Sequence, residues 1–110
     1  MKVSRLTIRN DSTRRRSLSI TAYVEWVLGP SRTIAAPHIV TELDSCGAVF
    51  ARNPWNQPFP GVTFVDLRAA QTEFTCDARE FLGRHGVLAA PAALVSGAPL
   101  SGRTGAGLDP

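Results

Sequence analysis

The stretch SLSITAYVEWVLGPSR, residues 17–32, alternates apolar and polar side chains along most of its length. Every even position from Leu18 to Leu28 is apolar, whereas the odd positions carry mostly hydroxyl groups, including Tyr23, and the acid Glu25. A period of two predicts a β-strand that is buried on one side only. We therefore expect the apolar side to enter a core between two sheets. The side with Tyr23 and Glu25 is expected to be a second packed or half-exposed surface, not a reaction centre.

Further strands are predicted on both sides of this stretch. The segment 3–10 (VSRLTIRN) alternates in the same way, and Asn10–Ser12 then interrupts it with residues typical of turns. Two such strands joined by a short loop indicate an antiparallel hairpin, so we expect 3–10 to pair with 17–28. The turn residues Asp44–Gly47 predict a second hairpin. The expected strands are residues 3–10, 17–28, 39–43, 47–52, 61–67 and 71–77.

Helix is expected to be scarce. Residues 31–37 fit either a helical turn or a loop, and residues 78–82 (AREFL) fit one helical turn that Gly83 stops. Residues 87–110 are rich in Ala, Gly, Pro and Ser and show neither period, which is typical of an extended loop or tail. The prediction is one all-β domain, an antiparallel β-sandwich with its core in 1–86 and an extended tail in 87–110.

The charge of the chain gives little support to nucleic-acid or membrane binding. The net charge is +3 and the pI about 9.5, but eleven of the twelve basic residues are arginines, and apart from the cluster Arg14–Arg16 they are scattered along the chain. This cluster fits a solvated turn better than a phosphate or partner contact, because no aromatic residues lie among the arginines. No apolar run has the length of a membrane helix, and no signal peptide is recognisable. We expect no nucleic-acid partner and no membrane contact by this segment.

The scan for metal sites and catalytic groups is largely negative. Cys46 and Cys76 fit free structural thiols, with one disulfide or a metal site as alternatives, and their spacing to the histidines matches no zinc signature. Glu42 and Asp44 flank a turn, where solvated acids are expected, and His38 fits a loop histidine better than a base. Glu25 is expected to be a buried, hydrogen-bonded acid. We predict no catalytic residues, no metal site and no cofactor.

The loop RNPWNQPFPG, residues 52–61, is the strongest candidate for a ligand surface. Its prolines stiffen the backbone, and a tryptophan ring can stack on the apolar face of a sugar while amides bind the hydroxyls. The alternative, that Trp55 folds back and caps the core, agrees better with the usual burial of tryptophan. The predicted carbohydrate-binding residues are Arg32, Arg52, Asn53, Trp55 and Asn56.

Four segments of the chain together resemble a known family. They occur in the same order as in the β-sandwich module of glycoside hydrolase family 94, formerly glycosyltransferase family 36, and are most similar to its cyclic β-1,2-glucan synthases. The segments are VSRLTIRNDSTRRRSLSITAYVEWVLGPSR, VTELDSCGAVFARNPWN, REFLGRHG and GAPLSGRTGAGLDP.

The resemblance implies a part of a galactose-mutarotase-like supersandwich that accompanies a catalytic (α/α)₆ barrel. Enzymes of this family build β-glucan or cleave it with phosphate, and the barrel carries the chemistry. None of the barrel's motifs occurs here, so no activity is expected of these 110 residues. The family's module is about twice as long, which suggests an excised piece or a short gene remnant.

The resemblance also implies partners and a location. It points to a non-catalytic, structural module with weak β-glucan contact, on the cytoplasmic side of a synthase anchored in the bacterial inner membrane. The alternative is a standalone interaction module. Because a shortened sandwich leaves strand edges unpaired, we expect a homo-oligomer formed by strand pairing.

Overall fold

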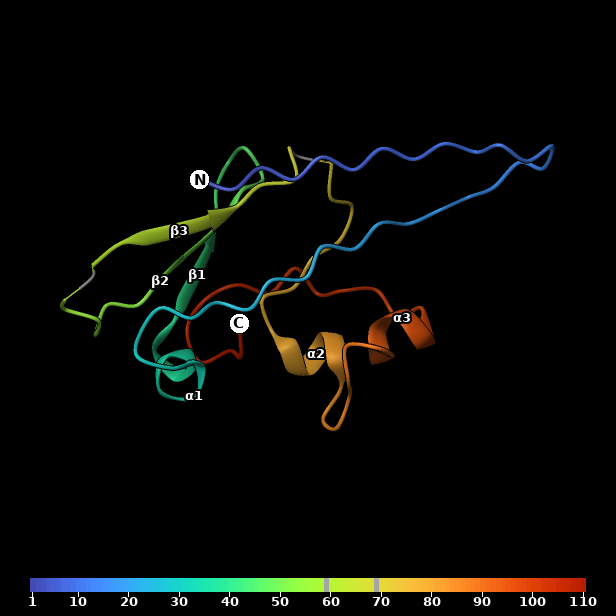
Figure 1. Cartoon of the computed structure of the whole chain (residues 1–110). Coiled ribbons are helices and arrows are strands. Elements are labelled where there is room, and N and C mark those ends of the chain that lie inside the picture. The colour runs from blue at the N-terminus through green and yellow to red at the C-terminus, as the bar shows by residue number, and fades with distance from the viewer. Residues whose placement is uncertain (59, 69) are drawn as a thin grey trace.

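A three-stranded antiparallel sheet lies toward one end of the elongated molecule (Figure 1). The computed structural model describes residues 1–58, 60–68 and 70–110. The strands stand in the order β1-β2-β3, and Thr41, Ala51 and Thr63 lie opposite one another in the register. Each strand falls inside a predicted segment, which confirms those three predictions. The strands are β1 (Val40–Leu43), β2 (Val49–Arg52) and β3 (Val62–Val65).

The hairpin between β1 and β2 forms for a local reason, as predicted. The Asp44 side chain accepts hydrogen bonds from the backbone amides of Cys46, at 2.8 Å, and Ala48, at 3.0 Å. Gly47 adopts a φ of 84°, a conformation that costs glycine little. The two strands are therefore held in register by their own turn.

The buried core is small and lies between the sheet and the helical segment before it. Ile39 and Ala51 are almost fully buried, and Trp26 and Leu28 pack partly against them. Of the two alternatives for residues 31–37, the structure has the helical turn, which Ser31 caps through its hydroxyl. The elements here are helix α1 (Arg32–Ala35) and the 3₁₀ turn η1 (Ala36–His38).

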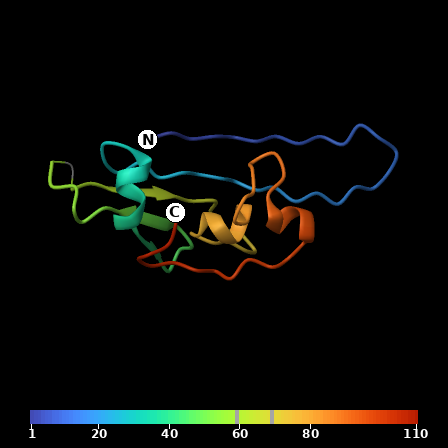
Figure 2. The same cartoon turned by 90° about the horizontal axis from the view of Figure 1, so that it is seen from below.

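The predicted hairpin of residues 3–10 and 17–28 is wrong. Both segments run extended along a projecting arm, residues 1–24, but neither pairs with a neighbouring strand (Figures 1 and 2). Leu18 and Ile20 are 66% and 65% exposed, so the apolar side enters no core at this end. Alternation specifies which side a strand would bury, but burial needs a partner surface. Only residues 25–28, the base of the arm, reach such a surface, where Trp26 and Leu28 pack against the core.

The C-terminal half differs from the prediction in two places. Residues 71–77 join no sheet, whereas the predicted helical turn is present as α2 (Ala78–Leu82), which begins after Asp77 and ends at Gly83 with a φ of 89°. The segment 87–110 contains a helix, α3 (Ala92–Ser96), where we expected no regular structure. This helix packs beside α2.

Residues 98–110, the C-terminal strap, return along the body of the molecule. They run beside residues 73–78 in the same chain direction and then reach the outer edge of β1 (Figures 1 and 2). Backbone hydrogen bonds hold the strap at four places. They join Gly102 N to Phe74 O, Cys76 N to Arg103 O, Thr41 N to Gly105 O, and Ala78 N to Asp109 O, at 2.7–3.0 Å.

The described residues therefore form an antiparallel β domain, as the predicted fold class states, with three short α-helices beside the sheet. The sheet keeps one face open, as expected of part of a sandwich. Among the described residues, no helix combines the length and apolar character that crossing a membrane requires.

Candidate functional site

Trp55 projects into solvent from the loop after β2. Its side chain is 76% exposed, so the prediction that it caps the core is wrong. Its ring centroid lies 6.0 Å from that of His38, with the planes tilted by 51°. The predicted loop 52–61 is described except for Phe59, which lies outside the described residues.

Asn53 turns the loop so that Trp55 faces outward. It is buried, and its side-chain oxygen accepts a hydrogen bond from the Trp55 amide at 3.0 Å. Its Nδ2 donates to the carbonyl of Leu28 at 2.7 Å, and the Nδ2 of Asn56 donates to the same carbonyl at 3.3 Å. Both amides, predicted as sugar ligands, thus tie the loop to the base of the arm.

A shallow, mostly apolar groove opens beside this junction. It has a volume of about 450 Å³, and Asn56 is the residue that links it to the tryptophan. The groove offers a surface on which the apolar face of a sugar ring can lie, with one amide at its edge. Its lining consists of Val27–Pro30, Asn56, Pro58 and Gly61–Thr63.

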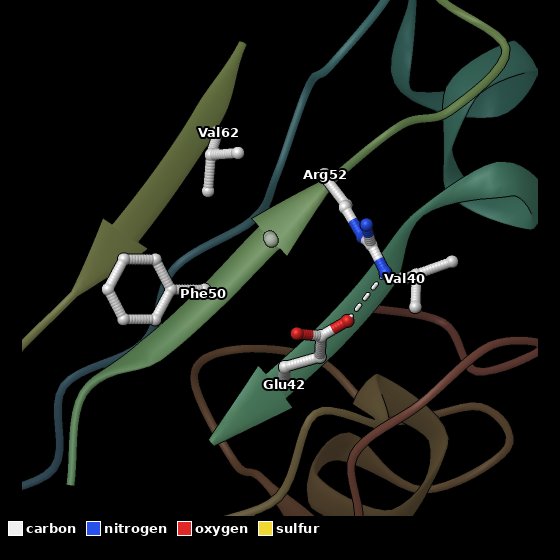
Figure 3. A pocket seen from close by; sticks show the side chains of 6 residues that line it. Val40, Glu42, Phe50, Arg52 and Val62 are labelled. Atoms are coloured by element: carbon white, nitrogen blue, oxygen red, sulfur yellow. Dashed lines mark hydrogen bonds and ion pairs between the residues drawn. The ribbon is translucent and has the colours of Figure 1, made fainter. Parts of the chain in front are cut away.

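Arg52 lies on the open face of the sheet, where it is paired with an acid (Figure 3). Its guanidinium contacts the Glu42 carboxylate at 2.7 Å, and both side chains are more than half exposed. Phe50 and Phe64 lie opposite each other on the same face, with ring centroids 5.8 Å apart. A hollow of about 170 Å³ is present here, lined by Val40, Glu42, Phe50, Ala51, Arg52 and Val62.

Arg32, the last predicted sugar ligand, connects three segments of the chain. It donates to Asp109 at 2.8 Å and lies 3.7 Å from the Glu25 carboxylate. Helix α1 is thereby joined both to the base of the arm and to the C-terminal strap. Of the five predicted site residues, the structure brings Asn53, Trp55 and Asn56 into one loop, and it gives Arg32 and Arg52 acidic partners.

Tyr23 and Glu25 form a packed surface, as expected of this side of the stretch. The Tyr23 hydroxyl donates to Glu25 at 2.9 Å, and its ring stacks on Phe81 of α2 with centroids 5.6 Å apart. Burial raises the pKa of Tyr23 to about 12, and its hydrogen bond to the Glu25 carboxylate adds to the shift. Glu25 accepts this hydrogen bond, but its side chain is 44% exposed, so the expectation of a buried acid is wrong while that of a hydrogen-bonded one is confirmed.

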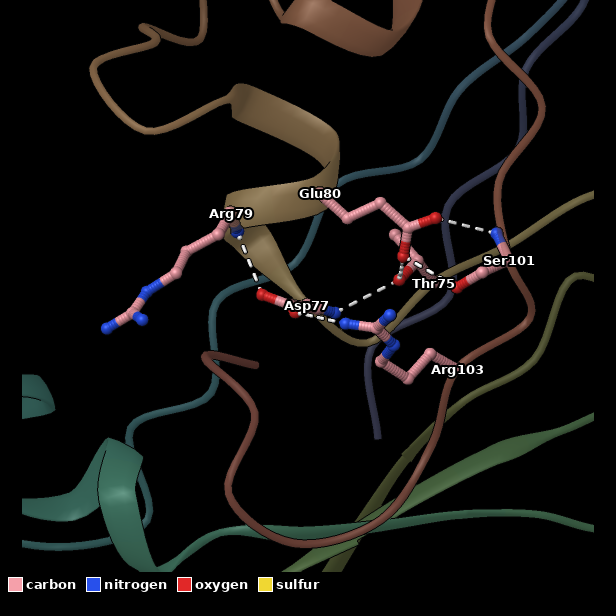
Figure 4. A network of polar contacts seen from close by, with 6 residues as sticks. All are labelled: Thr75, Asp77, Arg79, Glu80, Ser101 and Arg103. Carbon is pink, nitrogen blue, oxygen red and sulfur yellow. Dashed lines mark hydrogen bonds and ion pairs between the residues drawn. The ribbon is translucent and has the colours of Figure 1, made fainter.

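A polar network lies at the start of α2, and the sequence pattern did not lead us to predict it (Figure 4). Glu80 accepts hydrogen bonds from Thr75, at 2.5 Å, and from the amide and hydroxyl of Ser101, both at 2.7 Å. These hydrogen bonds hold the pKa of Glu80 below its usual range, and the one from Thr75 has the largest effect. The available signal was the pair Asp77 and Glu80, spaced as in a helix capping box. Asp77 does cap α2 and also binds Arg103 of the strap.

The two thiols of the chain are free. Cys46 is exposed in the β1–β2 turn, whereas Cys76 is buried, and burial raises the pKa of its thiol. Within the described ranges, no group of His, Cys, Asp and Glu side chains is arranged to hold a metal ion.

Comparison with known proteins identifies the family. The sequence matches the family described as "Glycosyl hydrolase 94, supersandwich domain" over residues 1–110. The chain belongs to this family. A cyclic beta-(1,2)-glucan synthase, NdvB of Rhizobium meliloti (strain 1021), is 43% identical over 105 residues, which cover 94% of this chain and 4% of that relative. No solved structure matches the chain.

Membership of the glycosyl hydrolase 94 supersandwich family agrees with the observed sheet. In a sandwich two sheets pack face to face, so that the inner face of each sheet is buried against the other sheet and the outer face points outward. In this chain of the glycosyl hydrolase 94 supersandwich family, one face of the sheet packs against α1. The other face, which carries Phe50 and Phe64, is open. The chain spans only 4% of the length of its synthase relative.

Proposed function

We propose that the chain is a non-catalytic supersandwich module of a larger enzyme that makes or phosphorolyses β-glucan. The family assignment and the printed name of the synthase relative support this proposal. In such an enzyme the module packs against a catalytic (α/α)₆ barrel and shapes the surroundings of the glucan. It supplies no reacting group itself.

The observation that carries the proposal is that the acidic side chains make structural contacts and do not face one another in a pair. Cleavage of a glycosidic bond needs two carboxyl groups facing each other across the bond. Here five of the nine acids pair with arginines, two cap turns, and two hold the strap, so each is engaged in a structural contact. The pairs involve Asp11, Glu25, Glu42, Asp77 and Asp109, the turns Asp44 and Asp66, and the strap Glu73 and Glu80.

Activity assays test the non-catalytic role. The chain is incubated with β-1,2-glucan plus phosphate and, separately, with UDP-glucose, and the products are separated by chromatography. We expect no product above the buffer control. Product formation that a Glu42→Gln or Glu25→Gln substitution abolishes would refute the proposal.

Weak glucan contact is proposed at the exposed tryptophan. Trp55 supplies an open ring face, His38 a second ring beside it, and Asn56 an amide at the groove edge. We expect β-1,2-glucan oligosaccharides to shift Trp55 fluorescence with millimolar affinity, and Trp55→Ala to remove the response. The matched control is Trp26→Phe, which keeps the core filled and should leave the response intact.

A second candidate is a standalone module that associates through its strands. The specific observation in its favour is the arm, whose extended backbone carries no pairing along residues 3–10 and 17–24. Unpaired extended backbone is a template for another chain. Light scattering over a dilution series separates the candidates, because a chain that stays at 11.8 kDa at all concentrations does not associate.

A further inference from the structure

Charge is divided unevenly between the arm and the rest of the chain. Residues 1–16 hold six basic residues and one acidic residue, a net charge of +5, whereas residues 17–110 hold six basic and eight acidic residues, a net charge of −2. Figures 1 and 2 show that the tip of the arm points away from the sheet and the helices. The tip of this cationic segment is therefore held apart from the anionic rest of the molecule.

The arm also exposes a row of apolar side chains. Leu6 and Ile8 are 64% and 51% exposed, and Leu18, Ile20 and Val24 on the returning segment are 42–66% exposed. In each extended segment these residues occupy alternate positions and so share one side. Exposed apolar rows of this length are typical of surfaces that become covered.

The open face of the sheet is the second uncovered apolar surface. Val62 and Phe64 of the edge strand β3 are 60% and 50% exposed, and Phe50 lies beside them (Figure 3). Glu42 and Arg52 border these residues, and their contact neutralises both charges. This face can therefore accept an apolar layer without leaving an unpaired charge beneath it.

We propose that two copies of the chain associate by exchanging arms, so that the apolar side of each arm covers the open sheet face of the other copy. This inference rests on the second candidate function above and specifies its surfaces. The cationic arm then lies against a body of opposite net charge. The same contact occurs twice around a two-fold axis, which closes the assembly at a dimer.

Two alternatives fit the structure less well. Contact between two arms would bring two groups of +5 charge together, which repel at close range. The N-terminal end of the arm lies near the sheet, but the tip lies at the opposite end of the molecule, so the residues next to the tip would have to reverse direction to cover their own sheet (Figures 1 and 2).

Matched substitutions on the two sides of the arm test the proposal. Leu18→Asp with Ile20→Asp removes apolar contacts, whereas Ser19→Asp with Thr21→Asp adds the same charge on the opposite side. Because these residues are exposed, both variants should keep the fold of the body, which circular dichroism checks. We expect the first variant to raise the dimer dissociation constant about 30-fold or more above the second, measured by sedimentation equilibrium. Equal effects of the two variants would overturn the proposal.

Disulfide trapping identifies the surface that the arm covers. In a Cys46→Ser background, a copy with Ile20→Cys is mixed with a copy with Phe64→Cys, and Thr21→Cys replaces Ile20→Cys in the control. We expect rapid formation of the mixed dimer with Ile20→Cys and at least about fivefold less with Thr21→Cys. Dimers linked only between two arms would overturn the proposed arm exchange but would still support association through strands. A chain that stays monomeric at every concentration would overturn both the arm exchange and the second candidate function.

Discussion

The guanidinium of Arg32 binds the carboxylate of Asp109 at 2.8 Å, although the two residues are 77 positions apart in the chain. Both side chains are about two-thirds buried. The same arginine lies beside Glu25, so one side chain connects α1, the base of the arm and the strap. The contact makes the C-terminal residues part of the folded body.

Loss of this contact should destabilise the domain measurably. We expect Arg32→Ala to lower the free energy of unfolding by about 1–2 kcal/mol, because it removes a charge-assisted hydrogen bond in a partly buried place. The matched control is Arg52→Ala, which breaks the exposed pair with Glu42 and should cost less than about 1 kcal/mol. Urea unfolding of each variant, with Asp109→Ala and Glu42→Ala for double-mutant cycles, gives both coupling energies. Equal coupling in the two pairs would contradict the structural role of Arg32.

The two tryptophans should differ in their contribution to stability. Trp26 packs against the buried cluster of Ile39 and Ala51, so Trp26→Ala is expected to cost about 2–3 kcal/mol. Trp55 is 76% exposed, and Trp55→Ala should cost less than about 1 kcal/mol. Thermal melts of both variants provide the comparison. A similar loss of melting temperature in the two would show that Trp55 is packed in solution.

Tyr23 should ionise at unusually high pH. It is the single tyrosine of the chain, so the ultraviolet titration of tyrosinate reports on it alone. We expect a midpoint near 12 in the folded protein, against an ordinary value of about 10. Because the folded pKa is raised, the stability that this group contributes is complete below pH 10 and is lost as the pH rises toward 12.

Glu25→Gln serves as the control for the tyrosine titration. It removes the carboxylate that accepts the hydroxyl hydrogen bond but leaves the stacking of Tyr23 on Phe81 in place. The midpoint should therefore fall while remaining above its ordinary value. A wild-type midpoint near 10 would mean that Tyr23 does not pack on α2.

The strap should loosen at acid pH through Glu80. Its folded pKa is lowered, so its contribution to stability is complete above the ordinary glutamate pKa of about 4.3 and is lost as the pH falls through the folded value. Urea midpoints between pH 7 and pH 3 should fall more steeply in the wild type than in Glu80→Gln. Thr75→Val, which removes the hydrogen bond that lowers the pKa of Glu80 most, should flatten the curve partly. Parallel curves for all three proteins would rule out this role.

Local interactions explain which elements could be predicted from the sequence. The Asp44 side chain binds amides two and four residues away, so the turn and the two strands beside it follow from neighbouring residues. Helix α2 likewise has its stop signal, Gly83, directly after it. The arm could not be predicted in this way, because alternation in 17–28 does not state where a partner strand lies.

The candidate site shows a similar division. The tryptophan and the two asparagines were selected for their chemistry, and the structure does place them in one loop. The two asparagines anchor the loop through the Leu28 carbonyl, which accepts hydrogen bonds from both amides, 25 and 28 residues away. Because a backbone group accepts them, no side chain in the sequence indicates these contacts. The contacts of Gly102 and Gly105 in the strap are equally hidden, because backbone groups make them.

The strap has a further consequence for how the chain reaches its native state. Thr41 is buried, and both its amide and its hydroxyl bind Gly105, which is synthesised 64 residues later. Contacts of such sequence separation form slowly, because a long loop must close first. Until the last residues dock, the outer edge of β1 is open to neighbouring chains, and aggregation competes with folding during that interval.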